Sequence, residues 1–384
     1  MPLDIVRSVV FMAFAAAGVS GSIGRNDQLT AELKSYLGSE DGTDRGFFPR
    51  FNSDPDHQLI GGDCSVVWGP VAVVPPGKDE PDYVANAMYV AYSPSQNTYV
   101  LAVAGTAHHS FFDWAVEDAD VTWLNTVRWS KWVPGAPHAA LISGGTDDGL
   151  GNLLDREAPC RGRPDKVTVR TFLKGVHPVG RLIVTGHSLG GALSPAMALM
   201  FHDELRESGW SDIRVLPLAG PTPGDRGFAE IFMKTFHPEW ETTTPDFYWN
   251  CDIQNVHDLV PRAWDRLRTV LQPSNAVTDA ETAGRHPSIW GDMTGEVALG
   301  LRAFVDLLSA LAVGVSYTPL SPMRFDDTFG HFEKGTNRWI SWSTPLDGFP
   351  IGSMDEMSKL ILASHYDQYI RHFGLIPLTG TAFG

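Results

Sequence analysis

The clearest candidate for a reactive side chain in this sequence is Ser188, which stands in a Gly-His-Ser-Leu-Gly-Gly run at 186–191. A hydrophobic Arg-Leu-Ile-Val-Thr stretch at 181–185 leads directly into this run, and helix-forming residues follow it. A serine at the sharp turn between a strand and a helix has a strained backbone and an exposed hydroxyl. Glycines on both sides remove the Cβ atoms that would collide at such a turn. The pattern therefore predicts a nucleophilic serine; the alternative is a glycine-rich turn whose serine only caps the helix.

A serine hydroxyl is a weak nucleophile until a base accepts its proton, so a histidine oriented by a carboxylate must complete the site. The N–H of Leu189 begins the following helix, where the positive end of the helix dipole would stabilise a developing oxyanion. In hydrolases with this turn the carboxylate follows the serine along the chain, and the histidine comes last. The candidates for the carboxylate are Asp225, Asp252 and Asp258, and those for the base are His286, His331, His365 and His372.

The elements that must position these side chains alternate along the chain. The residue pattern predicts a hairpin at 88–105, strands at 181–185, 214–219 and 247–253, and helices at 167–175, 189–207 and 227–236. Such alternation favours an α/β layer fold with a largely parallel sheet. Residues 26–80 predict a helix followed by acidic, Pro- and Gly-rich coil. The pattern loosens between 264 and 350, apart from an apolar stretch at 296–316 that predicts a buried or capping helix.

Composition excludes several classes of protein. The chain has 384 residues, of which 43% are hydrophobic and 19% charged, so it can form a sizeable core and is neither disordered nor a coiled coil. The net charge of −16 is a poor match for nucleic acid or anionic lipid, which bind clustered cations. Three cysteines, Cys64, Cys160 and Cys251, exclude a disulfide-dense scaffold, and none stands in the Cys-x-x-Cys pair of a zinc ribbon.

An apolar run at 9–19 follows Arg7 near the start of the sequence. It is too short to span a bilayer, but it resembles the hydrophobic core of a secretory signal peptide. The alternative is a helix that packs on the body of the protein. Asp4 beside Arg7 favours this second interpretation, because a signal peptide is positively charged before its apolar core. Both interpretations stay open, and with them a secreted or a cytoplasmic location.

Several motifs in a fixed order resemble the class 3 (fungal-type) lipase family of the α/β-hydrolase superfamily. The stretch RLIVTGHSLGGALSPAMAL at 181–199 resembles the strand, turn and helix around the serine of that family. Ala-Gly-Pro at 219–221, with the glycines that follow, resembles its glycine-rich turn. Asn-Val-His-Asp-Leu-Val-Pro-Arg at 255–262 resembles its N-x-x-D-x-V-P-R segment. Ala-Gly-Thr at 104–106 stands where the family usually has Arg-Gly-Thr or Arg-Gly-Ser.

The resemblance implies one α/β-hydrolase domain over residues 1–384, with a mostly parallel central sheet and flanking helices. Helices and coil are then expected at 1–80, a lid at 107–123, and an insertion or cap at 264–350. The resemblance also assigns roles within the site. Asp258 would orient the base, and His365, in Ser-His-Tyr-Asp-Gln-Tyr, resembles the C-terminal histidine of the family. The backbone N–H groups of Thr106 and Leu189 would bind the oxyanion, and neither a cofactor nor a metal is expected.

Apolar and acidic residues are mixed along the expected lid, as in a short amphipathic helix that covers an acyl pocket. An ordinary surface helix packed on the core is the alternative. Candidate lid or substrate-binding residues are Phe111, Phe112 and Trp114, together with His187 beside the nucleophile. A metal site is a weak alternative for His108, His109 and Asp113, because nothing else completes a ligand set.

The resemblance implies a serine hydrolase that cleaves carboxylic esters through an acyl-enzyme, and a triacylglycerol lipase above all. A feruloyl or other aryl esterase and a phospholipase A1 could use the same residues. A catalytically silent scaffold with the same fold, and a protein that only binds lipid surfaces, are alternatives from other classes. The expected partners are an ester or lipid substrate and a lipid–water interface, without nucleic acid. The oligomeric state stays open.

Overall fold

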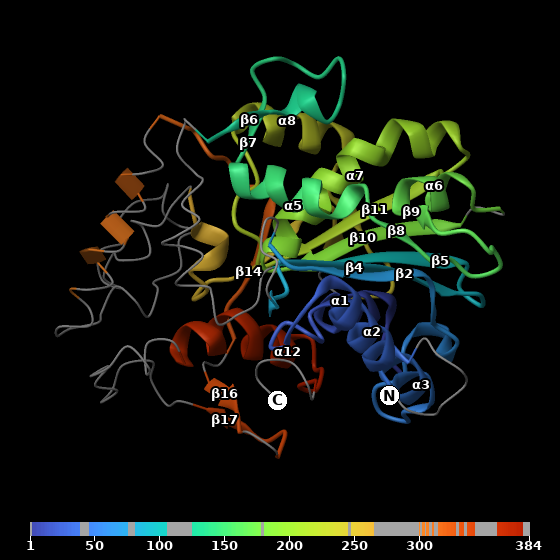
Figure 1. Ribbon diagram of the computed structural model, residues 1–384. Helices are drawn as coiled ribbons and strands as arrows, with labels where there is room; N and C mark the ends of the chain where they lie inside the picture. Colours follow the sequence, from blue (N-terminus) through green and yellow to red (C-terminus); the bar gives the residue numbers. More distant parts are fainter. Residues whose placement is uncertain are drawn as a thin grey trace.

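The computed structural model describes residues 2–38, 46–75, 81–105, 125–177, 180–244, 247–264, 314–327, 330–333, 336–341 and 359–378, and a few positions between 299 and 310. Within this part of the chain, seven strands form a central sheet in the order β15-β14-β11-β10-β5-β4-β2 (Figure 1). Their bounds are β2 (Ser65–Val73), β4 (Asn86–Ser93), β5 (Thr98–Ala104), β10 (Arg181–His187), β11 (Asp212–Leu218), β14 (Asp252–Asn255) and β15 (Pro322–Phe325). The strands from β5 to β15 pair in parallel, whereas β2 and β4 are antiparallel to their neighbours.

Helices cover both faces of this sheet. Above it in Figure 1 lie α5 (Gly144–Leu154), α6 (Val169–Lys174), α7 (Leu189–Glu207) and α8 (Arg226–Thr235), and below it lie α1 (Ile5–Ala16), α2 (Asn26–Leu37), α3 (Phe47–Ser53) and α12 (Gln368–His372). Short antiparallel pairs complete the described elements: β1 (Ile23–Gly24) with β3 (Asp82–Tyr83), β6 (Val127–Arg128) with β7 (Leu141–Ile142), β8 (Glu157–Ala158) with β9 (Val167–Thr168), β12 (Glu239–Trp240) with β13 (Tyr248–Trp249), and β16 (Gly330–Phe332) with β17 (Trp339–Ser341). Successive side chains of a strand point to opposite faces. Ile183 of β10 therefore joins the core on the α1 side, and Leu182 and Val184 join the core on the α7 side.

The structure confirms the predicted α/β fold with a mostly parallel sheet, and it corrects the prediction for residues 26–80. We expected coil after the first helix there, but β2 forms one edge of the sheet. Its Gly69-Pro70 pair and two register shifts interrupt the strand pattern. Proline lacks the N–H that a ladder needs, so an edge strand tolerates it. The predicted strand at 247–253 is also divided, into β13 and β14.

The region between 264 and 350 contributes to the sheet itself. We expected a cap or an outlying insertion, but β15 pairs in parallel with β14 and extends the sheet by one strand. This part of the region therefore belongs to the central sheet. Most of the apolar stretch at 296–316 lies outside the described residues.

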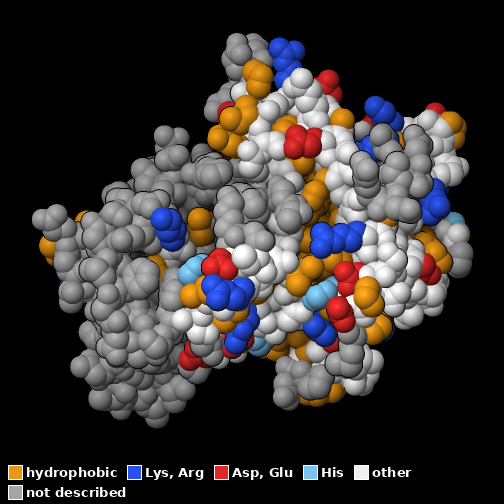
Figure 2. All heavy atoms as spheres, turned by 90° about the horizontal axis from the view of Figure 1, so that it is seen from below, with side chains coloured by type: hydrophobic (Ala, Val, Ile, Leu, Met, Phe, Trp, Pro, Cys, Tyr) orange, Lys and Arg blue, Asp and Glu red, His pale blue; other side chains and the backbone are white. Residues whose placement is uncertain are grey.

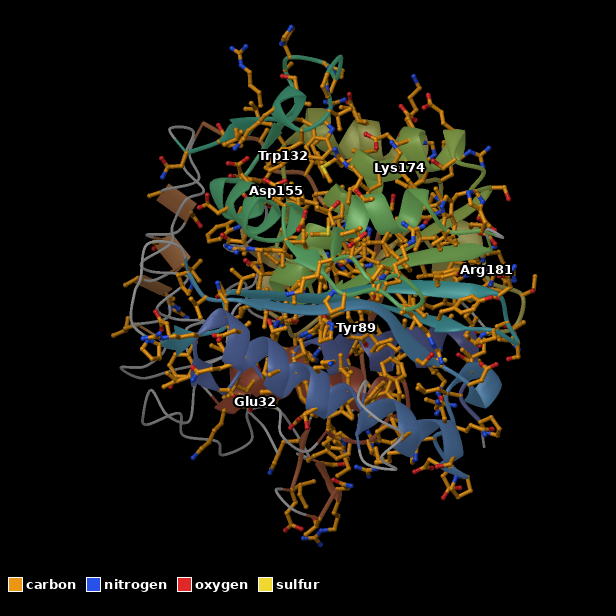
Figure 3. The ribbon with its side chains drawn as sticks, turned by 45° about the vertical axis from the view of Figure 1, so that its right-hand side comes forward. Glu32, Tyr89, Trp132, Asp155, Lys174 and Arg181 are labelled. Carbon is orange, nitrogen blue, oxygen red and sulfur yellow. The ribbon has the colours of Figure 1, made fainter. Side chains whose placement is uncertain are left out.

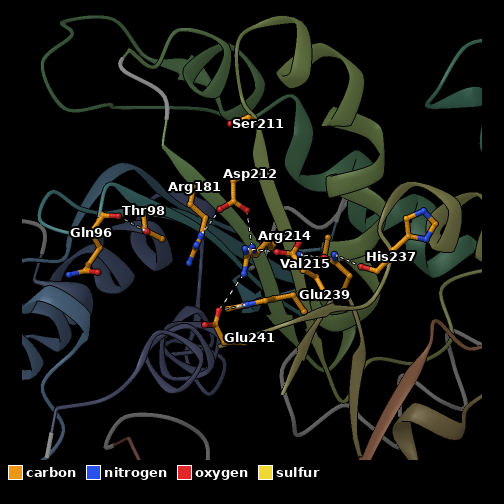
Figure 4. A network of polar contacts seen from close by, with 12 residues as sticks. Gln96, Thr98, Arg181, Ser211, Asp212, Arg214, Val215, His237, Glu239 and Glu241 are labelled. Atoms are coloured by element: carbon orange, nitrogen blue, oxygen red, sulfur yellow. Dashed lines mark hydrogen bonds and ion pairs between the residues drawn. The ribbon is translucent and has the colours of Figure 1, made fainter. Parts of the chain in front are cut away.

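Ion pairs connect β10 and β11 at the ends that lie farthest from Ser188. Arg181 and Arg214 donate to the two carboxylate oxygens of Asp212 at 2.7 and 2.8 Å. Arg214 also donates to Glu239 at 2.6 Å and to Glu241 at 3.3 Å, as Figure 4 shows. Burial opposes ionisation of Asp212, but the two guanidinium groups hold the pKa of its carboxyl below the usual range. This network fastens the β12–β13 hairpin to the sheet away from the candidate site.

The apolar run near the start of the chain forms the interior helix α1. Every residue of α1 except Arg7 is buried. Asp4 caps the helix, since its carboxylate accepts the N–H of Arg7 at 2.8 Å. Tyr89 of β4, on the α1 side of the sheet (Figure 3), donates its hydroxyl hydrogen to the carbonyl of Met12 at 2.8 Å. The same run that resembles a signal peptide is thus part of the core. None of the described helices combines the length and the apolar character that crossing a membrane would need.

Candidate active site

Ser188 lies at the sharp turn between β10 and α7. Its backbone has φ 61° and ψ −132°, a conformation that costs a non-glycine residue about 1–3 kcal/mol. The N–H of Ser188 donates to the carbonyl of Leu218 on β11 at 3.0 Å, which holds the turn at the carboxyl ends of two parallel strands. A Cβ on Gly186 or on Gly190 would collide with the carbonyl oxygen of Val103 on β5. The glycines of the motif therefore let β5 approach the turn closely.

The N–H of Leu189 opens helix α7 beside this serine. The end of β5 packs directly against it, because a Cβ on Gly105 would lie only 2.8 Å from the backbone nitrogen of Leu189. The N-terminus of a long helix is favourable for a developing negative charge. The geometry thus fits an oxyanion at the amide of Leu189. Thr106, which follows Gly105 in the sequence, lies outside the described residues.

The structure brings Asp258 and His365 together although 107 residues separate them. The Nδ1–H of His365 donates to Oδ2 of Asp258 at 2.8 Å, and the aspartate side chain is fully buried. The other carboxylate oxygen accepts the N–H of Val260 at 3.0 Å. A carboxylate held in this way fixes both the orientation and the tautomer of the imidazole, and leaves Nε2 as the proton acceptor.

His365 stands in a π-helical turn, Ala363–Asp367, that continues into α12. Such turns are rare and are frequent at functional sites. The carbonyl of His365 accepts the Nε2–H of His187 at 2.8 Å, and the two rings lie 4.5 Å apart. Because His187 immediately precedes Ser188, this hydrogen bond places His365 next to the turn that carries Ser188.

The side chain of His187 does not lie where a residue that binds substrate would be expected. We expected it to contribute to the lid or the substrate site, but its side chain is buried on the α1 side of the sheet. The ring of Phe14 lies 4.5 Å from its ring, and that of Tyr369 lies 5.8 Å away. These contacts favour a supporting role beneath the base.

Tyr369 is a member of the site that sequence reasoning missed. Its hydroxyl donates to Oδ2 of Asp258 at 3.1 Å and accepts the N–H of Asn255 at 2.8 Å. Burial, and then the nearby Asp258 charge, raise the pKa of Tyr369 well above its usual value, so it stays a hydrogen-bond donor. The available signal was its position four residues after His365, which places both side chains on one face of a helix.

Removing the hydroxyl of Tyr369 should affect both the fold and the candidate site. In Tyr369→Phe the N–H of Asn255 loses its acceptor, which costs about 1–3 kcal/mol of unfolding free energy. The carboxylate of Asp258 loses a donor, and we expect kcat for an ester to fall about tenfold. The matched control is Tyr89→Phe, which removes a buried hydroxyl that donates to the carbonyl of Met12. An equal fall in kcat for both variants would contradict the role assigned to Tyr369.

Comparison with known proteins agrees with this fold. Residues 166–266, about a quarter of the chain, match the model of the family described as lipase (class 3). Comparison with curated proteins gives no match. Among solved structures the chain is similar in fold to M37 lipase, with 22% identity, 85% of each chain covered and a TM-score of 0.58.

Two further solved structures are similar to the chain at lower TM-scores. One is a mono- and diacylglycerol lipase from Aspergillus oryzae, with 18% identity, 68% of this chain and 74% of that chain covered, and a TM-score of 0.41. The other is a triacylglyceride lipase from Rhizomucor miehei, with 24% identity, 46% and 55% coverage, and a TM-score of 0.33.

The other two carboxylates considered from the sequence, Asp225 and Asp252, form hydrogen bonds elsewhere in the structure. Asp225 caps α8, since its side chain accepts the N–H of Phe228 at 2.9 Å. Asp252 accepts the side-chain amide of Gln254 at 2.8 Å, and burial raises the pKa of Asp252 well above its usual value. An imidazolium is best stabilised by an ionised carboxylate, and burial disfavours this form of Asp252. Of the three carboxylates considered from the sequence, Asp258 is the one that contacts His365.

Two of the other histidines considered as the base, His331 and His372, lie in different environments from His365. His331 lies on β16, and burial lowers its pKa. His372 stacks on the ring of Phe325, with 4.0 Å between the ring centroids. His286 lies outside the described residues. The same holds for the lid expected at 107–123, with Phe111, Phe112 and Trp114, and for the weak metal candidate within it.

No group of three or more metal-binding side chains occurs in the part of the chain that the structure describes. Its three cysteines all lie in this part, and each is buried and free.

The carboxyl of Asp367, two residues after His365, should make stability depend on pH. It accepts the N–H of Phe332 at 3.0 Å, and burial raises its pKa to about 7. An unfolded aspartate titrates near 4, so between about pH 4 and 7 the folded state binds the proton more tightly. The unfolding free energy should therefore fall as pH rises through this window, by about 3 kcal/mol in all.

Denaturant unfolding of Asp367→Asn at pH 5 and pH 7.5 tests this dependence. The variant should lose most of the difference between the two pH values, because an amide does not titrate. Asp203→Asn, at a side chain that is 90% exposed, should keep it. A wild-type slope that persists in Asp367→Asn would assign the pH dependence to another group.

Proposed function

We propose that Ser188, His365 and Asp258 form the catalytic triad of this lipase, and that it hydrolyses acylglycerol esters through an acyl-enzyme. The observation that carries the proposal is the buried hydrogen bond from His365 to Asp258, combined with the contact of His365 to the residue before Ser188. A half-buried serine at a strained turn and a histidine oriented by a carboxylate meet the requirements for acyl transfer.

The reaction follows from the roles of these groups. The Oγ of Ser188 attacks the ester carbonyl carbon, and its proton passes to Nε2 of His365. The oxyanion that forms is bound by the N–H of Leu189, with Thr106 proposed from the sequence as the second donor. The C–O bond to the alcohol breaks, and the alcohol leaves with the proton from His365. Water then attacks the acyl-enzyme by the same route and releases the carboxylic acid and the free serine.

The buried surroundings of Asp258 support its role in this reaction. Charge develops on the imidazole when it accepts the serine proton, and the carboxylate stabilises that charge. Val260 and Tyr369 donate to the same carboxylate, so it is oriented before the substrate arrives. Orientation in advance is the chief source of electrostatic stabilisation in such sites. None of these steps calls for a cofactor.

An acylglycerol is the substrate best supported by the family match and by the apolar segment at 107–123. The test is hydrolysis by the full chain of p-nitrophenyl esters from acetyl to palmitoyl, of emulsified triacylglycerol, of phosphatidylcholine vesicles and of methyl ferulate. We expect long-chain esters and triacylglycerol to be cleaved, with a rise in rate when an interface forms. Preference for ferulate, or for the sn-1 ester of phosphatidylcholine, would reassign the substrate. A folded protein that cleaves none of them would be a scaffold.

A further inference from the structure

Helix α1 and the helical segment that carries His365 lie on the same side of the sheet (Figure 1). Figure 2 views the molecule from this side, where basic, acidic and apolar side chains are mixed on the surface. The segment is helical from residue 359 to residue 372, with the π-helical turn in its middle. Two contacts join it to α1, one next to His365 and one just past the C-terminal end of α12.

The first contact is a double hydrogen bond from Arg7. Its Nε–H donates to the carbonyl of Phe373 at 2.6 Å, and its Nη2–H donates to the carbonyl of Gly374 at 2.9 Å. These carbonyls stand just past the C-terminal end of α12. A guanidinium at this point satisfies acceptors that the helix leaves unpaired, and its charge is favourable at the negative end of the helix dipole. Arg7 is also the one residue of α1 that is not buried.

The second contact is the aromatic packing of Phe14. Its ring lies 4.5 Å from that of His187 and 4.9 Å from that of Tyr366. His187 in turn donates to the carbonyl of His365. Arg7 and Phe14 stand seven residues apart and so share one face of α1. Their contacts follow in reverse order along the second segment, and the two helices therefore run in opposite directions.

We propose that α1 positions the catalytic base: Arg7 and Phe14 hold the helical segment that carries His365, and so keep its imidazole in place for Ser188. This inference rests on the proposed function. Catalytic groups must be held within about 0.5 Å of their working geometry. Anchors at Tyr366, which is next to His365, and at 373–374 meet this need. The apolar run at 9–19 then belongs to the active form of the protein.

The test compares Arg7→Met and Arg7→Lys with Arg163→Met in the full chain. Arg163 is a matched control, because its Nη2–H donates at 3.1 Å to the carbonyl of Gly175 at the C-terminal end of α6, which carries no triad residue. Two readouts are measured for each variant: kcat and KM for a p-nitrophenyl ester, and hydrogen–deuterium exchange of the amides at 359–374. The exchange measurement needs no turnover.

We expect kcat of Arg7→Met to fall about 10- to 100-fold with little change in KM, since displacement of a catalytic group acts on the chemical step. Exchange at 359–374 should rise in this variant. Arg7→Lys should restore part of both properties, and Arg163→Met should change neither. If Arg7→Met does not fold, Phe14→Leu replaces it, because this substitution keeps an apolar side chain but removes the ring.

Unchanged exchange at 359–374, or an unchanged kcat, would overturn the inference. So would a fall in kcat that Arg163→Met shares. Failure of the proposed function would look different: the wild type would cleave no ester and would leave Ser188 unlabelled by a fluorophosphonate, whatever the exchange data show. A rise in exchange without any wild-type turnover would leave α1 as an anchor of the fold and refute its role for the base.

Discussion

Ser188→Ala is expected to lower kcat for every ester substrate by about 10⁶, with KM and the unfolding free energy nearly unchanged. The substitution removes only the Oγ that attacks the ester in the proposed mechanism. It keeps the Cβ and therefore the backbone strain of the turn, so the fold should persist. The measurement is the hydrolysis rate of a p-nitrophenyl ester, with circular dichroism as the check on folding.

The matched control for this prediction is Ser194→Ala. Ser194 is a buried serine on the same helix, and its hydroxyl contacts the carbonyl of Gly191 at the limit of hydrogen bonding, 3.5 Å. Removal of the Ser194 hydroxyl should leave kcat within a factor of about two. The unfolding free energy should fall by about 1 kcal/mol or less, because one weak hydrogen bond is lost. Retained turnover in Ser188→Ala would refute the triad.

The nucleophile turn could be predicted from the sequence because its requirements are local. A serine between glycines, a strand before it and a helix after it are all contained in 181–199. The structure explains the glycines by the approach of β5, a contact that the motif implies without naming the partner. The order of the central strands and helices could be predicted for the same reason. The periodicity of apolar residues depends on the solvent exposure within each segment and needs no knowledge of the other segments.

The rest of the site depends on contacts between distant parts of the chain. The sequence pointed to Asp258 and His365 only through a family resemblance, because no local pattern tells which aspartate meets which histidine after 107 residues. The one local signal for Tyr369 was its spacing from His365, and the supporting position of His187 had none. Both depend on how the last helix packs on the sheet. Strands β2 and β15 were missed because edge strands tolerate irregular patterns and proline.

The apolar run at 9–19 shows a second limit of sequence patterns. A signal peptide and a buried helix need the same hydrophobicity, so composition cannot separate them. The charged residues before the run, Asp4 and Arg7, distinguish the two possibilities, but only the structure shows what they contact. Asp4 caps α1, and Arg7 caps the helix that follows His365. A charge pair that looked merely atypical for a signal peptide is thus part of the packing.

Asp258→Asn should lower kcat about 10⁴-fold without a comparable change in KM. The amide of asparagine can donate to Nδ1 of His365, which favours the tautomer that carries its proton on Nε2. That nitrogen then cannot accept the proton of Ser188. The measurement is kcat in Asp258→Asn and in Asp225→Asn, whose carboxylate caps α8 instead. The control should keep both its stability and its kcat, because asparagine caps a helix about as well as aspartate does.

The double variant Ser188→Ala with Asp258→Asn separates orientation of the base from any independent effect of the carboxylate. If Asp258 acts only through His365 on the serine hydroxyl, the double variant should be no slower than Ser188→Ala alone, because residues that act as one unit are not additive. A further loss in the double variant would mean that the Asp258 carboxylate also supports the residual reaction, for instance by holding the base for a water molecule. Full additivity of the two losses would show that Asp258 and Ser188 work independently, and the hydrogen bond at 2.8 Å would then have only a structural role.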